Sequence, residues 1–161
     1  MQKILISACL VGEKCNYKGE GNYNPGIEKL RENYDLVLFC PEMEGGMKCP
    51  RNPSEIKGNQ VVQKDGTDVT RQFELGANKA LALCKYLGIT KAVLKENSPS
   101  CGTHRIHNGY FMDRLIAGMG ITARLLKSKG IEVYSENEID QLLEPKKEKN
   151  SPCNSRTLLI Y

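Results

Sequence analysis

The sequence lacks the marks of an exported or membrane-bound chain. No apolar run approaches the roughly 20 residues that cross a bilayer, and the first residues carry no small-residue cleavage site of a signal peptide. The 23 lysines and arginines stand against 19 aspartates and glutamates, so the formal net charge is only +4, and no basic block gathers it. We therefore expect a cytoplasmic protein without a membrane segment, for which nucleic acid is not indicated as a partner.

Common nucleotide and metal motifs are also missing. The glycine-rich stretch from Cys9 to Tyr23 contains neither G-x-G-x-x-G nor the Walker pattern, so dinucleotide and P-loop binding have no motif support. None of the seven cysteines forms a C-x-x-C pair, which gives no support to a zinc knuckle. Cysteines in a chain without an export signal are more often metal ligands, catalytic groups or free thiols than disulfides.

The sequence does contain an alternation of strand and helix patterns. Short apolar runs predict four strands, at Lys3–Ala8, Asp35–Phe39, Ala92–Leu94 and Ile131–Tyr134. Helical spacing and end signals predict helices at 24–33, 67–87, 116–128 and 136–143. A shorter pattern predicts a hairpin arm at 61–67 around Asp65-Gly66, and residues 104–113 are interpreted as a polar loop.

This alternation predicts an α/β fold with a parallel sheet. With 40% hydrophobic and 26% charged residues, the chain suits one α/β domain over residues 1–144, followed by a polar tail at 145–161. We expect a Rossmann-like three-layer sandwich with a mostly parallel four-stranded sheet. Right-handed crossovers favour the strand order 2-1-3-4, which places the first strand between the second and the third.

A cysteine follows each of the first three predicted strands. Cys9 and Cys40 come directly after theirs, and Cys101 lies in a stiff loop after the third. In open parallel sheets, ligands bind outside the carboxyl ends of the strands. We therefore expect one shared crevice lined by the three thiols and by the neighbouring polar residues Glu42, Ser98 and Ser100.

Three thiolates suit an iron–sulfur cluster, zinc or Cu(I), because soft ligands select these metals. They also leave one metal position open, as catalysis requires. Cys84 lies within a helical pattern and is expected to be a buried small hydrophobe, while Cys153 in the tail receives no role. His104 and His107 lack metal-ligand spacing and are interpreted as polar loop residues.

Three blocks around these cysteines are specific in content and order. They are Ser7-Ala8-Cys9-Leu10 with Gly12, then Cys40-Pro41-Glu42 with Gly45-Gly46 and Pro50-Arg51, then Leu94-Lys95 with Ser98-Pro99-Ser100-Cys101-Gly102. Together they resemble a bacterial family long labelled a domain of unknown function, whose characterised members are thiouracil desulfurases (desulfidases). The resemblance covers about Lys3 to Leu143.

The resemblance implies that Cys9, Cys40 and Cys101 hold a [4Fe-4S] cluster whose fourth iron has no protein ligand. It also implies Glu42 and Ser98 as catalytic partners in a non-redox reaction. The sulfur of a thiolated pyrimidine binds the open iron, water attacks the ring carbon, and sulfide leaves. Glu42 is placed to take a proton from the water. Ser98 orients the water or the base, or only stabilises the turn.

Cys15 and Cys49 depart from the family pattern. Either could supply a fourth thiolate that closes the cluster or makes the site a zinc site. Since neither lies directly on a strand end, we expect both to be dispensable for cluster assembly.

The substrate and two other functions stay open at this point. Ser100, Lys95 and Arg51 are candidate substrate contacts, and Arg105 could also meet an anionic substrate. One alternative function is a zinc-stabilised α/β binding module without enzymatic activity. The other is a sulfur transferase that carries a persulfide on one cysteine and turns over without iron.

Overall fold

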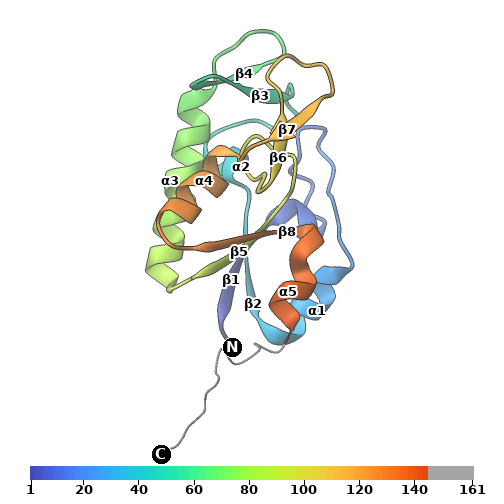
Figure 1. The fold of residues 1–161 in the computed structure, drawn as a ribbon, viewed down its shortest axis with the longest axis vertical. Coiled ribbons are helices and arrows are strands. Elements are labelled where there is room, and N and C mark those ends of the chain that lie inside the picture. Colours follow the sequence, from blue (N-terminus) through green and yellow to red (C-terminus); the bar gives the residue numbers. More distant parts are fainter. Residues whose placement is uncertain (145–161) are drawn as a thin grey trace, which may run out of the picture.

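Four parallel strands form the central sheet of the protein (Figure 1). The computed structural model describes residues 1–144, and the predicted tail at 145–161 lies outside them. The strands are β1 (Lys3–Ser7), β2 (Asp35–Phe39), β5 (Lys91–Leu94) and β8 (Glu132–Ser135). Their order, β2-β1-β5-β8, confirms the predicted order 2-1-3-4 and places β1 beside both β2 and β5.

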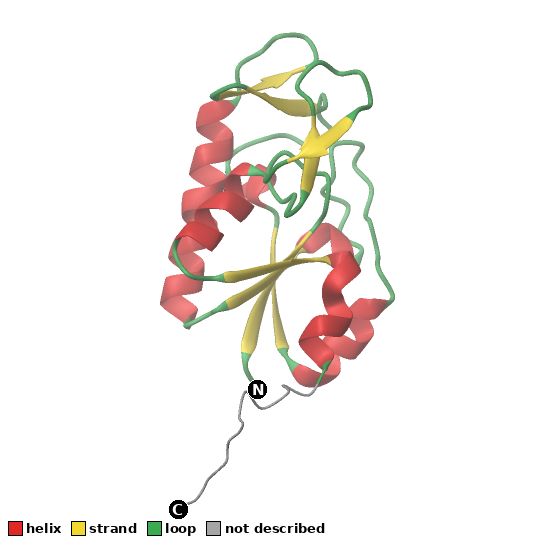
Figure 2. Cartoon of the chain, viewed as in Figure 1, coloured by secondary structure: helices red, strands yellow, loops and turns green. Residues whose placement is uncertain are grey.

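Helices cover both faces of this sheet (Figure 2). Alternate strand residues point to opposite faces. Ile4 and Ile6 therefore share a core with α1 (Gly26–Asn33) and α5 (Ile139–Leu143). Leu5 instead belongs to a core with α3 (Thr70–Leu87) and α4 (Ile121–Ser128). The result is the three-layer α/β arrangement expected from the alternating patterns.

Two small hairpins lie beyond the carboxyl edge of the sheet, near the short helix α2 (Pro41–Glu44) (Figure 1). One pairs β3 (Ser54–Lys57) with β4 (Gln60–Gln63), and the other pairs β6 (Arg105–His107) with β7 (Leu115–Ala117). A separate small core, which includes Val61 and Phe73, joins the first hairpin to α3. The hairpins therefore stand over the strand ends at which the predicted cysteines emerge.

The second hairpin corrects two predictions. The predicted polar loop at 104–113 contains β6, and the predicted helix at 116–128 begins only at Ile121. Residues 115–117 pair with 105–107 instead, and the Gly118 N–H donates to the His104 carbonyl at 3.0 Å before the helix begins. A Cβ on Gly120 would lie 2.4 Å from the carbonyl carbon of Ser100, so the chain there passes too close to the Cys101 loop for any side chain.

The predicted hairpin arm at 61–67 is only partly correct. The chain does reverse at Asp65-Gly66, where a single antiparallel bridge joins Val62 to Asp68. The main partner of β4 is β3, however, and their turn is Gly58-Asn59, with Gly58 at a φ of +61°. Gly-Asn is a recognised two-residue hairpin signal, and that signal was present in the sequence.

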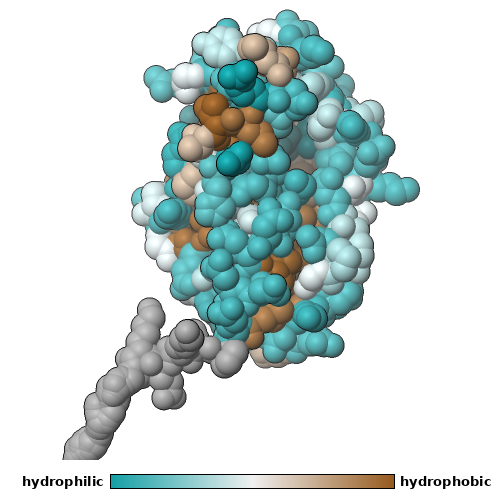
Figure 3. All heavy atoms as spheres, turned by 45° about the vertical axis from the view of Figure 1, so that its right-hand side comes forward, coloured by the Kyte–Doolittle hydropathy of each residue, from teal (hydrophilic) through white to brown (hydrophobic). Residues whose placement is uncertain are grey.

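The face of the molecule seen in Figure 3 is largely hydrophilic, with separate hydrophobic patches. The exposed large apolar side chains include Tyr110, Met112 and Ile116 of the second hairpin. Within residues 1–144, no helix combines the length and the apolar character needed to cross a membrane.

Candidate active site

A cavity of about 400 Å³ opens at the carboxyl edge of the sheet. Cys9, Cys40 and Cys101 all line it. They arrive from three neighbouring strands: Cys9 from the 3-10 helix directly after β1, Cys40 from the end of β2, and Cys101 from the loop after β5. The structure thus brings the three predicted thiols to one place, because the strand order makes β1, β2 and β5 adjacent.

The surroundings of the three thiols differ. Burial raises the pKa of Cys9, although a hydrogen bond with Asn22 lowers it in part. Burial also raises the pKa of Cys101, against a hydrogen bond with Ser7. By contrast, a hydrogen bond with Cys15 lowers the pKa of Cys40 to about 7. Cys40 is therefore the thiol of the three that is nearest to a thiolate at neutral pH.

The three thiols also affect one another. The charge on Cys40 raises the pKa of Cys9 and of Cys101, and the charge on Cys9 raises that of Cys101. All three are free thiols. As thiolates they repel one another, and a bound cationic group that accepts all of them removes this repulsion. Within the described residues, no three His, Cys, Asp or Glu side chains gather closely enough to hold a single metal ion.

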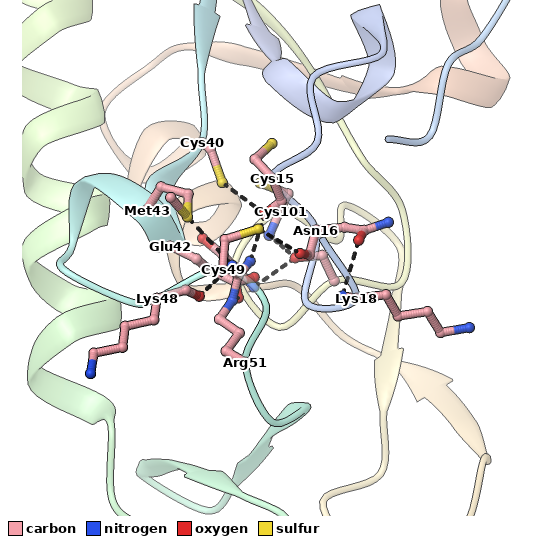
Figure 4. Close-up of polar contacts among 12 residues, drawn as sticks. Cys15, Asn16, Lys18, Cys40, Glu42, Met43, Lys48, Cys49, Arg51 and Cys101 are labelled. Carbon is pink, nitrogen blue, oxygen red and sulfur yellow. Dashed lines mark hydrogen bonds and ion pairs between the residues drawn. The ribbon is translucent and has the colours of Figure 1, made fainter. Parts of the chain in front are cut away.

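Glu42 lies in the cavity wall between a cation and a hydroxyl. Arg51 Nε donates to Glu42 Oε1 at 3.0 Å, and the two side chains are 5% and 15% exposed (Figure 4). Ser98 forms a hydrogen bond with the same carboxyl group. Burial raises the pKa of Glu42, while Arg51 and Ser98 act in the opposite direction. The predicted pair of Glu42 and Ser98 is therefore in direct contact, at the cavity that the thiols share.

Ser98 is held by the loop that carries Cys101. Its Oγ accepts the backbone N–H groups of Ser100 and Cys101, each at 3.0 Å. The Ser98 hydroxyl therefore stabilises the turn, and it also interacts with the Glu42 carboxyl group. Its role in orienting the water or the base stays a prediction.

Glu96 organises the rest of this loop from inside. Its Oε1 accepts the backbone N–H groups of Thr103, His104 and Arg105 at 2.9 to 3.1 Å, and its Oε2 accepts the Thr103 hydroxyl at 3.0 Å. Burial alone would raise the pKa of Glu96, but these hydrogen bonds outweigh it and lower the pKa. A buried carboxylate thereby fixes the path of the chain on the far side of Cys101.

Arg51 also connects two segments of the chain by hydrogen bonds to backbone carbonyls, which the sequence did not indicate. Besides Glu42, its guanidinium donates to the carbonyl of Lys48 at 3.0 Å and to that of Cys15 at 2.9 Å (Figure 4). It therefore joins α2 and the segment after it to the loop that follows Cys9. Arg51 also lines the cavity, so its contact with Glu42 and the predicted contact with substrate are compatible, and the latter stays a prediction.

The other candidate substrate contacts differ in their position relative to the cavity. Lys95 lines the cavity and pairs with Glu136 at 3.2 Å. Ser100 is fully buried, and its hydroxyl bonds to Thr122 at 2.8 Å, so it has no surface to offer a substrate. Arg105 is exposed and is not among the residues that line the cavity. Of these three, only Lys95 faces the cavity.

The remaining cysteines and the histidines fall into separate places. Cys15 lines the cavity beside Cys40, whereas Cys49 lies outside the wall and donates to the carbonyl of Lys14 at 3.2 Å. Cys84 is in the α3 core as expected, and burial raises its pKa to about 11. Cys153 lies outside the described residues.

The two histidines differ in their surroundings. His104 forms a hydrogen bond with Glu138 at 2.8 Å, whereas His107 lies in β6 and lines the cavity.

Sequence reasoning missed several residues that shape the site. Ser7 accepts the backbone N–H of Lys95 at 2.9 Å and so joins the ends of β1 and β5. Asn22 bonds to Cys9, and Glu96 holds the Cys101 loop. The only local signal was that Ser7 and Glu96 stand next to strand ends.

Comparisons with known proteins found a matching family and two similar proteins. The sequence model of a protein family described as 2-thiouracil desulfurase matches residues 4–138. The uncharacterized protein YbbK of Bacillus subtilis (strain 168) is 42% identical over 150 residues, covering 87% of this chain and 99% of YbbK. A solved structure of a [4Fe-4S]-dependent thiouracil desulfidase, TudS, is similar with a TM-score of 0.84 and 43% identity, covering 89% of this chain and 96% of TudS.

Proposed function

Because the chain belongs to the 2-thiouracil desulfurase family, we propose that it is an enzyme that removes sulfur from a thiolated pyrimidine such as thiouracil. The reaction is a hydrolysis that releases sulfide, and the cofactor is a [4Fe-4S] cluster. Similarity to the [4Fe-4S]-dependent desulfidase TudS supports both the substrate and the cofactor. The observation that carries the proposal is that three thiols and the Glu42–Ser98 pair line one cavity.

The residues present fit such a cluster. Cys9, Cys40 and Cys101 are free, lie on one cavity and repel one another as anions, so a cationic iron–sulfur group satisfies all three. A cluster held by Cys9, Cys40 and Cys101 would supply a Lewis acid with affinity for a soft thione sulfur.

The protein's own groups then act on water and on the ring. Glu42 accepts a proton from the attacking water, and Arg51 and Ser98 hold its carboxylate in place. Exchange of C=S for C=O by water yields sulfide and leaves the oxidation state of the ring carbon unchanged. No external electron donor or acceptor is therefore required.

The test begins with anaerobic purification and reconstitution. We expect brown protein with about four irons per chain, as a cubane requires. Incubation with 2- or 4-thiouracil should cause loss of thione absorbance with an equal amount of sulfide released. Replacement of Cys9, Cys40 or Cys101 by serine should abolish both the iron absorbance and turnover.

Cys49→Ser is the matched control, because this thiol lies outside the cavity wall. It should retain the iron and the activity. Stoichiometric zinc with no iron uptake would instead indicate a zinc-stabilised binding module. Sulfur transfer by iron-free protein would indicate a persulfide enzyme, and either result contradicts the proposal.

A further inference from the structure

A strap formed by residues 108–114, which follows the Cys101 loop in the chain, provides part of the cavity wall. It connects β6 to β7 above the carboxyl edge of the sheet (Figure 1). Phe111 and Asp113 of the strap line the cavity, together with His107 at its base. His107 and Asp113 face each other at 3.8 Å. The reaction chemistry described above uses none of these residues.

The strap is pinned by one buried carboxylate. Glu55 on β3 is 6% exposed, and its Oε1 accepts the backbone N–H of Gly109 at 2.9 Å and that of Phe111 at 3.2 Å. The two backbones also touch, since a Cβ on Gly109 would lie 2.5 Å from the carbonyl oxygen of Ile56. A hairpin from another part of the chain thus fixes where residue 111 stands.

The backbone of Phe111 has an unusual conformation. Its φ is +55°, a left-handed value that is uncommon for a bulky side chain and costs of order 1–3 kcal/mol. The next residue but one, Asp113, also has a φ of +55°. Such a conformation persists only where surrounding contacts impose it, and here the two hydrogen bonds to Glu55 do so. The consequence is an aromatic ring in the cavity wall.

We propose that Phe111 is the stacking platform for the planar pyrimidine ring of the substrate and that Glu55 is the positioning residue that holds it. This inference rests on the proposed function, because it specifies how the same cavity selects its substrate. Every pyrimidine has a π-face, so stacking on an aromatic ring orients the ring without reading its substituents. Phe111 then aligns the ring, while the thiol end of the cavity acts on the sulfur.

Binding of uracil, the ring that the reaction leaves behind, tests the inference separately from turnover. Calorimetric titration of reconstituted protein should show about tenfold weaker binding for Phe111→Ala, within the range known for base–aromatic stacking. Phe111→Leu keeps an apolar side chain but loses the π-face, so its affinity for uracil should fall as much as that of Phe111→Ala. Phe111→Tyr should bind within about twofold of the wild type. Tyr110→Ala is the matched control, because Tyr110 is 64% exposed and lies outside the cavity wall.

Kinetics test the positioning role of Glu55. Stacking acts equally on substrate and transition state, so Glu55→Ala and Phe111→Ala should each raise KM for thiouracil about tenfold with kcat within about twofold. The double variant should be no worse than either single one, because both remove the same contact. In Glu55→Gln the amide oxygen can still accept the two backbone N–H groups, so KM should return close to the wild-type value.

The outcomes separate this inference from the proposed function. If the wild type binds uracil in a Phe111-dependent manner but releases no sulfide, the proposed function fails and the platform stands. If sulfide is released normally and Phe111→Ala or Phe111→Leu matches the wild type in both KM and uracil affinity, the platform is overturned. Absence of uracil binding by the wild type, or additive losses in the double variant, also overturns it.

Discussion

Glu42 is subject to two opposing influences. Burial favours its neutral form, whereas the Arg51 guanidinium and the Ser98 hydroxyl favour the carboxylate. An arginine suits this position because its planar group holds five N–H donors in fixed directions, and these reach Glu42 and two backbone carbonyls from separate nitrogens. Burial outweighs these contacts and raises the pKa of Glu42, which favours proton uptake by a general base, and the same contacts fix the direction of its carboxyl group.

Replacement of Glu42 by glutamine should separate cluster binding from chemistry. The amide still accepts from Arg51 but cannot take a proton from water, so we expect unchanged iron content with turnover reduced at least about 100-fold. Iron analysis and sulfide release measure the two effects. Glu44→Gln, two residues on and exposed, is the control and should keep full activity. Normal turnover of Glu42→Gln would make Glu42 a structural residue and contradict the mechanism.

The site residues that could be predicted are those that follow an apolar run in the sequence. Cys9, Cys40 and Glu42 stand directly after apolar runs, and the end of such a run is visible in the sequence. Glu55 on β3 and Asn22 in the loop after Cys9 both line the cavity, but the arrangement depends on distant segments, so no local pattern marks them. Ser100 was misjudged because its neighbours in sequence line the cavity while its own hydroxyl turns back to α4.

At the scale of elements, the sheet could be predicted, whereas the second hairpin could not. The central strands β1 and β5 are mostly buried, and all four strands contain short apolar runs that can be recognised in the sequence. In contrast, β6 and β7 are three residues each and partly exposed, so their pairing depends on contacts with each other and with β3. The apolar spacing of residues 116–128 resembled a helix, but its first part is held as strand and Gly120 is needed for a close approach.

Glu96 gives the Cys101 loop a stability that depends on pH. Its pKa is lowered from an ordinary 4.5, so the folded state binds fewer protons than the unfolded state. The stabilisation is therefore complete above about pH 4.5 and is lost as the pH falls through the lower, folded-state pKa. Glu96→Gln should lower the free energy of unfolding by about 1.5–3 kcal/mol at pH 7, the range for hydrogen bonds to a charged group.

Urea unfolding of metal-free protein at a series of pH values measures this effect. The difference between wild type and Glu96→Gln should shrink as the pH falls below about 4.5. Glu32→Gln on the exposed face of α1 is the control and should follow the wild type throughout. A difference that stays constant with pH would mean that the charge of Glu96 contributes nothing and that only its shape matters.

At the scale of the whole molecule, the cluster proposal makes the site part of the fold's stability. The three thiols come from separate regions of the chain, and only the folded sheet brings them together. A group held by all three therefore binds the folded state and not the unfolded one, which stabilises the former by mass action. The segments that carry Cys9 and Cys101 should gain the most stability, because a bound group joins them across the cavity.

Removal of iron by a chelator should accordingly lower the melting temperature, by about 5–15 °C if the cluster contributes about 3–4 kcal/mol. The comparison is made anaerobically, with and without reconstitution, within each variant, so that the cost of the substitution itself cancels. Wild type and Cys49→Ser should show the full gain on reconstitution, and Cys9→Ser should show none. Equal melting temperatures for iron-loaded and iron-free wild type would mean that the thiols do not hold the cluster jointly, since a group bound by three strand ends cannot leave the folding equilibrium unchanged.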